Sequence, residues 1–297
     1  MATVQDIKRR LRSVRNTRKI TKAMELVAAA KLRRAEARIE AMRPYAERMR
    51  ELMVGTARAT PARGFPLLEA RETVGAVAIL PLTGDRGLAG AFNAQIIRRA
   101  LAVEREVRAD GADVRWVVAG KKGRSTLRFR RYAVEQAWVD FTDRPSYHDA
   151  EAIAHKLAEL FTEREVDRVV MVYNHYESAL TQTVTVEDVL PIPRTLLDED
   201  EAKSAYEIAL EGDFIYEPEP EEILDRLLPV YLETTVYRAL LESAASEHGA
   251  RMTAMRNASK NAGELIDVLT LEMNRARQAE ITQEILEVVA GADALTQ

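Results

Sequence analysis

Three glycines in the stretch TGDRGLAGAFN (Thr83–Asn93) are the residues whose type and spacing come nearest to a chemical site in this sequence. Gly84, Gly87 and Gly90 follow a predicted strand and precede a predicted helix, where a backbone can cradle a phosphate. Their spacing matches neither GxGxxG nor GxxxxGKS/T, the two patterns typical of nucleotide binding. The stretch therefore favours a tight turn at the sheet edge, with Asp85 and Arg86 pairing locally, over a nucleotide site.

The other reactive residue types give weaker signals. Lys121 and Lys122 begin a predicted helix and could bind an anion there, but a solvated helix start is the simpler interpretation. A run of acids, Glu199–Glu201, is typical of a solvated loop. Cysteine is absent, and the four histidines lack HxxxH or HxH spacing, which argues against a zinc site. We therefore predict no catalytic residue, no cofactor and no metal.

Charge is distributed unevenly along the 297 residues, although the net charge is only −4. Residues 1–50 hold 15 Lys/Arg against 5 Asp/Glu, whereas residues 187–228 hold 14 acids and 3 bases. Such asymmetry indicates charged partners. The N-terminal cations are spread around an apolar stripe that has no aromatic residues for base stacking. This pattern favours a helix flank that faces water or a partner over a nucleic-acid site.

Both ends of the chain carry long helical patterns. The predicted stripe of the first helix consists of Val4, Ile7, Leu11, Val14, Ile20, Met24, Ala28, Leu32, Ala35, Ile39, Met42, Ala46, Met49 and Met53. That of the last helix consists of Leu240, Ala244, His248, Met252, Met255, Ala258, Ala262, Ile266, Leu269, Met273, Ala276 and Glu280. Steps of three and four residues are typical of a coiled-coil seam. Pro44 and Pro229 are expected to bend these helices. We predict that residues 1–58 and 221–297 pair as one long antiparallel two-helix coiled coil.

Residues 70–220 have a different pattern, in which strands alternate with helices. Strands are predicted at 73–82, 113–120, 133–141, 167–176 and 180–192, and helices at 92–111, 121–132 and 146–166, the last with Ser146 as N-cap. This alternation predicts a doubly wound, Rossmann-like α/β domain between the two terminal helices. Residues 193–220 are acidic and loop-rich, with a short strand predicted at Phe214–Tyr216. The fold class is therefore α/β with a long helical extension.

No stretch of about 18 apolar residues is present, and the N-terminus lacks the apolar core of a signal peptide. From the residues alone, we expect a cytoplasmic protein without a membrane span.

Motifs at both ends of the chain resemble one family. IKRRLRSVRNTRKITKAMELVAAAKLRRA (Ile7–Ala35) is similar to the start of the gamma subunit of the bacterial F-type rotary ATP synthase. The segment ARMTAMRNASKNAGELIDVLTLEMNRARQAEITQEILEVVAGADAL (Ala250–Leu295) resembles that family's C-terminal signature. GDRGLAGAFN resembles its internal turn, and DFIYEPEPEEIL resembles the segment before its last helix.

The resemblance implies a non-catalytic central rotor shaft, present in one copy per complex. The paired helices would stand inside a ring of three alpha and three beta subunits. The α/β domain would lie against the epsilon subunit and the membrane c-ring, at the cytoplasmic face of the bacterial plasma (inner) membrane. Proton-driven rotation of the c-ring would turn the shaft. Its asymmetry would then drive each beta subunit through the states that bind, make and release ATP.

The resemblance also implies partner contacts for individual residues. Met24 would lie near the acidic lever loop of a beta subunit, and Arg251, Gln278 and Thr282 would touch the beta catch loop near the top of the shaft. Phe214, Tyr216 and Glu217 would contact the c-ring and epsilon. The narrow Ala28–Ala30 stretch would keep the shaft slim, and its flanking cations would keep it hydrated.

Two other classes of function stay open on the residues alone. An enzyme would use the glycines of the Thr83–Asn93 turn to hold a nucleotide, and the isolated chain would then bind nucleotide tightly. A free-standing coiled-coil scaffold or nucleic-acid binder would retain DNA in a salt-sensitive way. Neither class accounts for matching motifs at both ends of the chain.

Overall fold

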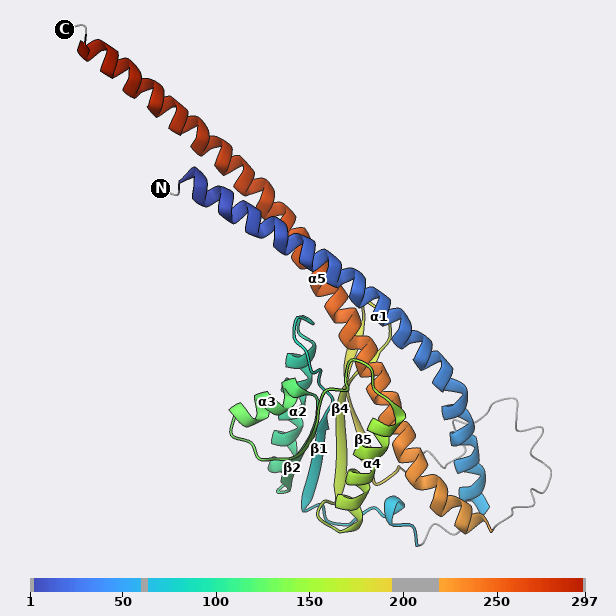
Figure 1. Cartoon of the computed structure of the whole chain (residues 1–297). Helices are drawn as coiled ribbons and strands as arrows, with labels where there is room; N and C mark the ends of the chain where they lie inside the picture. The colour runs from blue at the N-terminus through green and yellow to red at the C-terminus, as the bar shows by residue number, and fades with distance from the viewer. Residues whose placement is uncertain (1–2, 60–63, 194–218, 296–297) are drawn as a thin grey trace. The chain divides into compact units, whose positions relative to one another are not determined.

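A computed structural model of the 297-residue chain describes residues 3–59, 64–193 and 219–295 (Figure 1). The helices are α1 (Val4–Ala59), α2 (Phe92–Ala109), α3 (Lys121–Phe129), α4 (Tyr147–Thr162) and α5 (Pro220–Leu295), with a short 3-10 helix η1 (Pro66–Leu68). The strands are β1 (Ala76–Pro81), β2 (Asp113–Ala119), β3 (Val134–Trp138), β4 (Arg168–Tyr176) and β5 (Gln182–Leu190). The predicted elements between residues 70 and 192 are all present, with bounds that differ by a few residues.

The chain divides into two compact units. The helix-pair unit comprises Met1–Ala29 and Arg251–Gln297, and the α/β unit comprises Ala30–Ala250. Each of α1 and α5 is one continuous helix that belongs to both units, and each runs through its internal proline, Pro44 or Pro229. The sequence placed the boundaries near residues 58 and 220. The structure places them inside the two helices, because half of each helix packs within the α/β unit.

The α/β unit contains a five-stranded sheet in the order β3-β2-β1-β4-β5. The first four of these strands are parallel, and β5 is antiparallel to β4. Only residues 177–181 connect β4 to β5, and this connection is too short for a parallel crossover. The prediction of a doubly wound sheet is therefore confirmed for four strands, while the edge strand arises from a hairpin.

Alternate side chains of β1 belong to the two separate apolar cores of this unit. Val77 and Ile79 point to the face covered by α2 and α3. Ala78 and Leu80 point to the face covered by η1, α4 and the first part of α5. Because successive side chains of a strand point to opposite faces, one run of apolar residues serves both layers.

The first part of α5 is a core element of the α/β unit. Its buried apolar side chains in that core are Leu224, Leu228, Leu232, Val236, Ala239 and Leu240. Every residue from Ala239 to Gly249 is buried. The prediction that the whole of residues 221–297 pairs with residues 1–58 is therefore corrected, because the first thirty residues of α5 pack on the sheet instead.

The junction between β2 and α3 brings two backbones very close together. Gly120 has φ of +95°, and a Cβ atom built there would lie 2.0 Å from the carbonyl oxygen of Thr83. The Thr83 side chain forms two hydrogen bonds at the same junction. Its Oγ1 donates to the Ala119 carbonyl at 2.8 Å and accepts from the Gly123 amide at 2.8 Å. Only glycine fits at this position.

We predict that Gly120→Ala lowers the free energy of unfolding by about 2–5 kcal/mol, because positive φ and steric overlap both penalise the new methyl group. Gly111→Ala is the matched control. Gly111 also has positive φ, +86°, but nothing lies within 4 Å of the added Cβ, so its cost is about 1–2 kcal/mol. Urea unfolding of the two variants measures both values, and equal losses would contradict the proposed close contact.

Candidate partner-binding surface on the helix pair

The glycine-rich turn is filled by its own hydrogen bonds. Asp85 accepts from the Lys121 amide at 2.9 Å and from the Thr142 hydroxyl at 2.9 Å. The Lys122 amide donates to the Gly84 carbonyl at 3.1 Å, and the Gly123 amide donates to Thr83 Oγ1. The first three amides of α3 are thus already satisfied, so the start of this helix does not offer them to a phosphate.

Asp85 acts here as a structural anchor. Burial would raise its pKa, but hydrogen bonds from the amides of Asp140, Thr142 and Lys121 hold the pKa below its ordinary value. The expected pair with Arg86 is not found among the ion pairs of the described residues. Lys121 Nζ pairs with Asp140 Oδ1 at 2.5 Å.

The helix-pair unit holds the other candidate site. The start of α1 runs antiparallel along the second part of α5, and α5 continues beyond the start of α1 (Figure 1). Ile7 and Leu11 of α1 pack with Leu269 of α5, and Val14, Ile266, Met273 and Ala276 pack around them. These residues form a small apolar cluster between the two helices.

The buried side of α1 differs from the predicted seam over one stretch. Ile20 is 60% exposed and Met24 only half-buried, whereas Thr21 and Glu25 are buried. Ile20 and Met24 were predicted to be buried because their side chains are apolar. The cost of burying the Glu25 carboxylate is compensated by two cations: it accepts a hydrogen bond from Lys22 Nζ at 3.0 Å and another from Arg256 Nε at 3.2 Å. One ion-pair cluster therefore crosses between the two helices.

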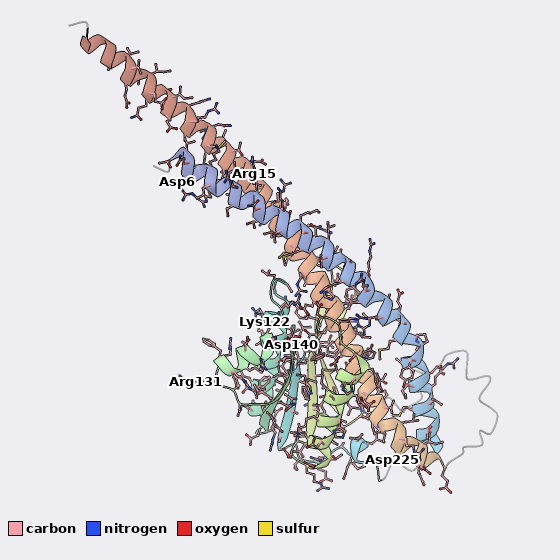
Figure 2. The ribbon with its side chains drawn as sticks, in the orientation of Figure 1. Asp6, Arg15, Lys122, Arg131, Asp140 and Asp225 are labelled. Atoms are coloured by element: carbon pink, nitrogen blue, oxygen red, sulfur yellow. The ribbon has the colours of Figure 1, made fainter. Side chains whose placement is uncertain are left out.

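A groove of about 1120 Å³ lies on the helix-pair unit and is strongly basic. Its cations are Arg12, Arg15, Arg18, Lys19, Lys22, Arg256 and Lys260, and Glu25 is its one acid. Arg15 projects from the part of α1 that lies beside α5 (Figure 2). Arg12, Arg15 and Lys19 form no ion pair with any residue that the structure describes. Such a surface attracts an acidic partner.

The residues predicted to contact partners are not all brought together. Gln278 and Thr282 are exposed one turn apart on α5, where the Thr282 hydroxyl donates to the Gln278 carbonyl at 2.9 Å. Arg251 is 27 residues before Gln278, about 40 Å along a helix, and only 8% exposed. Arg251 therefore does not lie with the other two near one end of the shaft. Phe214, Tyr216 and Glu217, with the strand predicted there, lie outside the described residues.

The last turns of α5 carry apolar side chains that sequence reasoning did not single out. Ile281, Ile285, Leu286, Val288 and Val289 are all exposed. Their spacing of three and four residues places most of them on one helix face. This apolar spacing was visible in the sequence, but the predicted seam ended at Glu280 and did not include the residues beyond it.

Within the described residues, no group of three or more His, Asp or Glu side chains is arranged to hold a metal ion. No described helix combines the length and the hydropathy needed to cross a membrane. The described residues therefore form an α/β unit with a layered core and a helix-pair unit that carries a basic groove.

Comparisons with known proteins identify the family. The family model described as ATP synthase matches residues 3–295. ATP synthase gamma chains from Rubrobacter xylanophilus and Moorella thermoacetica are 47% and 46% identical to this chain. Each alignment covers 99% of this chain and 99% or 100% of the relative. The chain belongs to the ATP synthase gamma chain family.

Solved structures agree with this assignment. A chain from the central stalk and c-ring of Tetrahymena thermophila mitochondrial ATP synthase is 28% identical, with a TM-score of 0.59 over 81% of this chain and 99% of that chain. A rotor chain of Euglena gracilis mitochondrial ATP synthase has a TM-score of 0.65 over 94% of this chain and 98% of that chain. At 19% identity, the second likeness shows the fold alone.

We predict that Glu25→Gln weakens the helix pair by about 1 kcal/mol at pH 7, because it removes a buried carboxylate that is hydrogen-bonded to two cations. The hydrogen bond from Lys22 and the charge of Arg256 hold the Glu25 pKa below 4.5, its ordinary value. The stabilisation is therefore present above about pH 4.5 and is lost as the pH falls through the lowered pKa.

Urea unfolding of the full chain at pH 7 and in acid measures this effect. Glu264→Gln is the control, because Glu264 pairs with Lys260 at 4.0 Å with both side chains exposed, and it is expected to change stability by under about 0.5 kcal/mol. A difference between wild type and Glu25→Gln that stays constant into acid would contradict the assigned ion-pair role.

Proposed function

We propose that the chain is the non-catalytic rotor shaft of an F-type ATP synthase and couples c-ring rotation to conformational change in the catalytic beta subunits. The observation that supports this most is the continuity of α5. One helix has its first part in the core of the α/β unit and its second part in the helix pair. In this proposal, the helix shared by both units carries torque from one to the other.

Polar contacts fix the orientation of α5 in the α/β unit. Arg238 donates to both carboxylate oxygens of Glu187 on β5, at 2.7 and 2.8 Å, and to the Tyr173 hydroxyl at 3.1 Å. Glu242, one turn further along α5, accepts from Arg238 at 3.2 Å and contacts His175 at 2.6 Å. Burial would lower the pKa of Arg238, but Glu187 and Glu242 raise it. The guanidinium is therefore a permanent charge in this cluster.

The second half of α1 is attached to the same unit. Lys31 pairs with Asp143, and Glu36 accepts from the Tyr176 hydroxyl. Arg38 donates to the Pro145 carbonyl at 2.5 Å and to the Tyr237 hydroxyl at 3.3 Å. Residues 31–38 thus hold the second half of α1 within the α/β unit, which also contains the first part of α5.

In this proposal, the two helices form an antiparallel coiled coil inside a ring of three alpha and three beta subunits. The basic groove of the helix-pair unit faces acidic surfaces of beta, and Met24 lies near an acidic lever loop. Gln278 and Thr282 contact beta further along α5. The buried Arg251 contributes from inside the helix pair, so a direct contact with beta requires its side chain to become exposed.

The apolar face of the last α5 turns would slide against the surrounding ring. Ala28 is buried, and in this proposal its small side chain keeps the shaft slim. A shaft of this kind contacts the three beta subunits differently at each angle. A ligand or partner shifts a conformational equilibrium only by its differential affinity for the states, and these unequal contacts would supply that difference.

The proposal also assigns the base of the shaft. Phe214, Tyr216 and Glu217 would contact the c-ring and the epsilon subunit, at the cytoplasmic face of the plasma membrane. One copy of the chain would serve each complex. The nucleotide-enzyme alternative is weakened because the first three amides of α3 are already hydrogen-bonded. The nucleic-acid alternative is weakened because, among the described residues, no aromatic side chain lines the basic groove.

A single-cysteine cross-link tests the shaft proposal, because the chain contains no cysteine of its own. We expect Gln278→Cys, carrying a photoactivatable cross-linker with a cleavable disulfide, to attach to one beta subunit in the purified complex. Cross-linking should abolish ATP hydrolysis in proportion to its yield, and reduction should restore it, because the shaft can no longer turn.

Glu163→Cys is the control, since Glu163 is exposed at the end of α4 in the α/β unit. The same reagent there should give no attachment to beta and no loss of turnover. Complexes that stay fully active after the Gln278→Cys variant is cross-linked to beta would contradict the rotor assignment.

A further inference from the structure

A second groove, of about 590 Å³, lies in the α/β unit between α2 and α3. Its floor includes Ile97 and Leu101 of α2, one turn apart. Four cations surround this floor: Arg98 and Arg105 on α2, Lys122 on α3, and Arg130 just after α3. The rotor function proposed above makes no use of this groove.

The four cations are not neutralised by the described residues. Arg105 Nε donates to the Leu101 carbonyl at 3.2 Å, which leaves its charge unpaired. Arg98, Lys122 and Arg130 form no ion pair with a described carboxylate. The acids of α2 are already used: Glu106 binds Arg99 at 2.9 Å, and Glu104 binds Arg108 at 2.9 Å.

Glu104 is the one acid that lines the groove, and it does not cancel the rim charge. It is buried, and its second carboxylate oxygen accepts from the Tyr132 hydroxyl at 2.9 Å. That hydrogen bond raises the pKa of Tyr132, so the phenol stays protonated as the donor. With Glu104 held by Arg108 and Tyr132, the groove keeps a positive field.

An exposed aromatic side chain lies at one end of α3. Phe129 is 88% exposed and is followed directly by Arg130 and Arg131. Figure 2 shows Lys122 and Arg131 at opposite ends of the α3 region. A solvated phenyl ring beside cations is typical of an anchor for a protein partner, since aromatic residues and arginine contribute most to interface binding energy.

The shape selects the class of partner. The apolar floor and the α2 cations span residues 94–105, about three helical turns. An apolar stripe between two positive rims complements a helix that has an apolar face flanked by Asp and Glu. An isolated phosphate fits poorly, because the α3 amides are satisfied by residues 83–85. We propose that the α2–α3 groove binds an acidic amphipathic helix of another polypeptide.

The test uses the full chain and a designed peptide of about four turns, with Leu on one face and Glu on both flanks. Ser125→Cys, exposed on α3 and unique in this cysteine-free chain, carries an environment-sensitive fluorophore beside the groove. This local probe separates binding here from binding at the basic groove of the helix-pair unit. We expect a saturable signal with the peptide, and none with a peptide of the same composition in scrambled order.

Arg98→Ala with Arg105→Ala should weaken the peptide affinity about tenfold, since two rim charges are lost. Arg33→Ala with Arg34→Ala removes the same charge from exposed positions on α1 and should change the affinity less than twofold. Circular dichroism checks that both variants fold. Equal affinity of the groove variant and wild type, equal binding of the scrambled peptide, or a signal only with anionic lipid vesicles would overturn the proposal.

Discussion

The packing of the first part of α5 against the sheet is the interaction on which the rest of this structure depends. Burial of one leucine side chain contributes about 2 kcal/mol, and Leu224, Leu228 and Leu232 are all buried there. A hydrogen bond to a charged group contributes about 1.5–3 kcal/mol before solvent exposure is discounted. Apolar packing therefore fixes α5 in the α/β unit, and the Arg238–Glu187 contact sets its orientation.

This division of roles explains why polar residues are found at positions of close helix contact. Glu25 is buried in the helix-pair unit and pairs with the exposed side chains of Lys22 and Arg256. The Arg18 side chain lies 3.6 Å from a Cβ atom built at Gly263. Replacing such groups with leucine would add apolar area but remove a feature that specifies register. The helix pair has a small apolar core and a strongly basic groove on its surface.

Much of the fold could be predicted from the sequence, because strand and helix periods differ and Ser146 forms the predicted N-cap, with Asp149 completing a capping box. The partners of α5 could not be predicted in the same way. Leu240, Ala244 and His248 repeat with the same period as Leu269 and Met273, although the first group packs in the α/β unit. Periodicity reports which face of a helix is buried, and it does not report whether a sheet or a helix covers that face.

The candidate site shows the same limit. The excess of cations near the N-terminus was visible in the sequence, but the choice of Thr21 and Glu25 over Ile20 and Met24 as buried positions depends on Arg256, 231 residues away from Glu25. The α2–α3 groove likewise brings together cations between Arg98 and Arg130 that are far apart in the sequence, and no local sequence pattern predicts that they line one groove. By contrast, the antiparallel β5 strand could have been inferred, because the predicted strands at 167–176 and 180–192 leave only residues 177–179 between them, which permits only a hairpin.

Native-state hydrogen exchange of the full chain tests most directly whether α5 is a core element of the α/β unit. The account predicts that amides of Leu232–Gly249 exchange only with global unfolding of that unit, at the same free energy as the central strands β1 and β4. Amides beyond Ala276, where α5 is exposed, should exchange orders of magnitude faster. Early exchange throughout Leu232–Gly249, while β1 and β4 stay protected, would contradict the account, since α5 would then be a separate helix resting on the sheet.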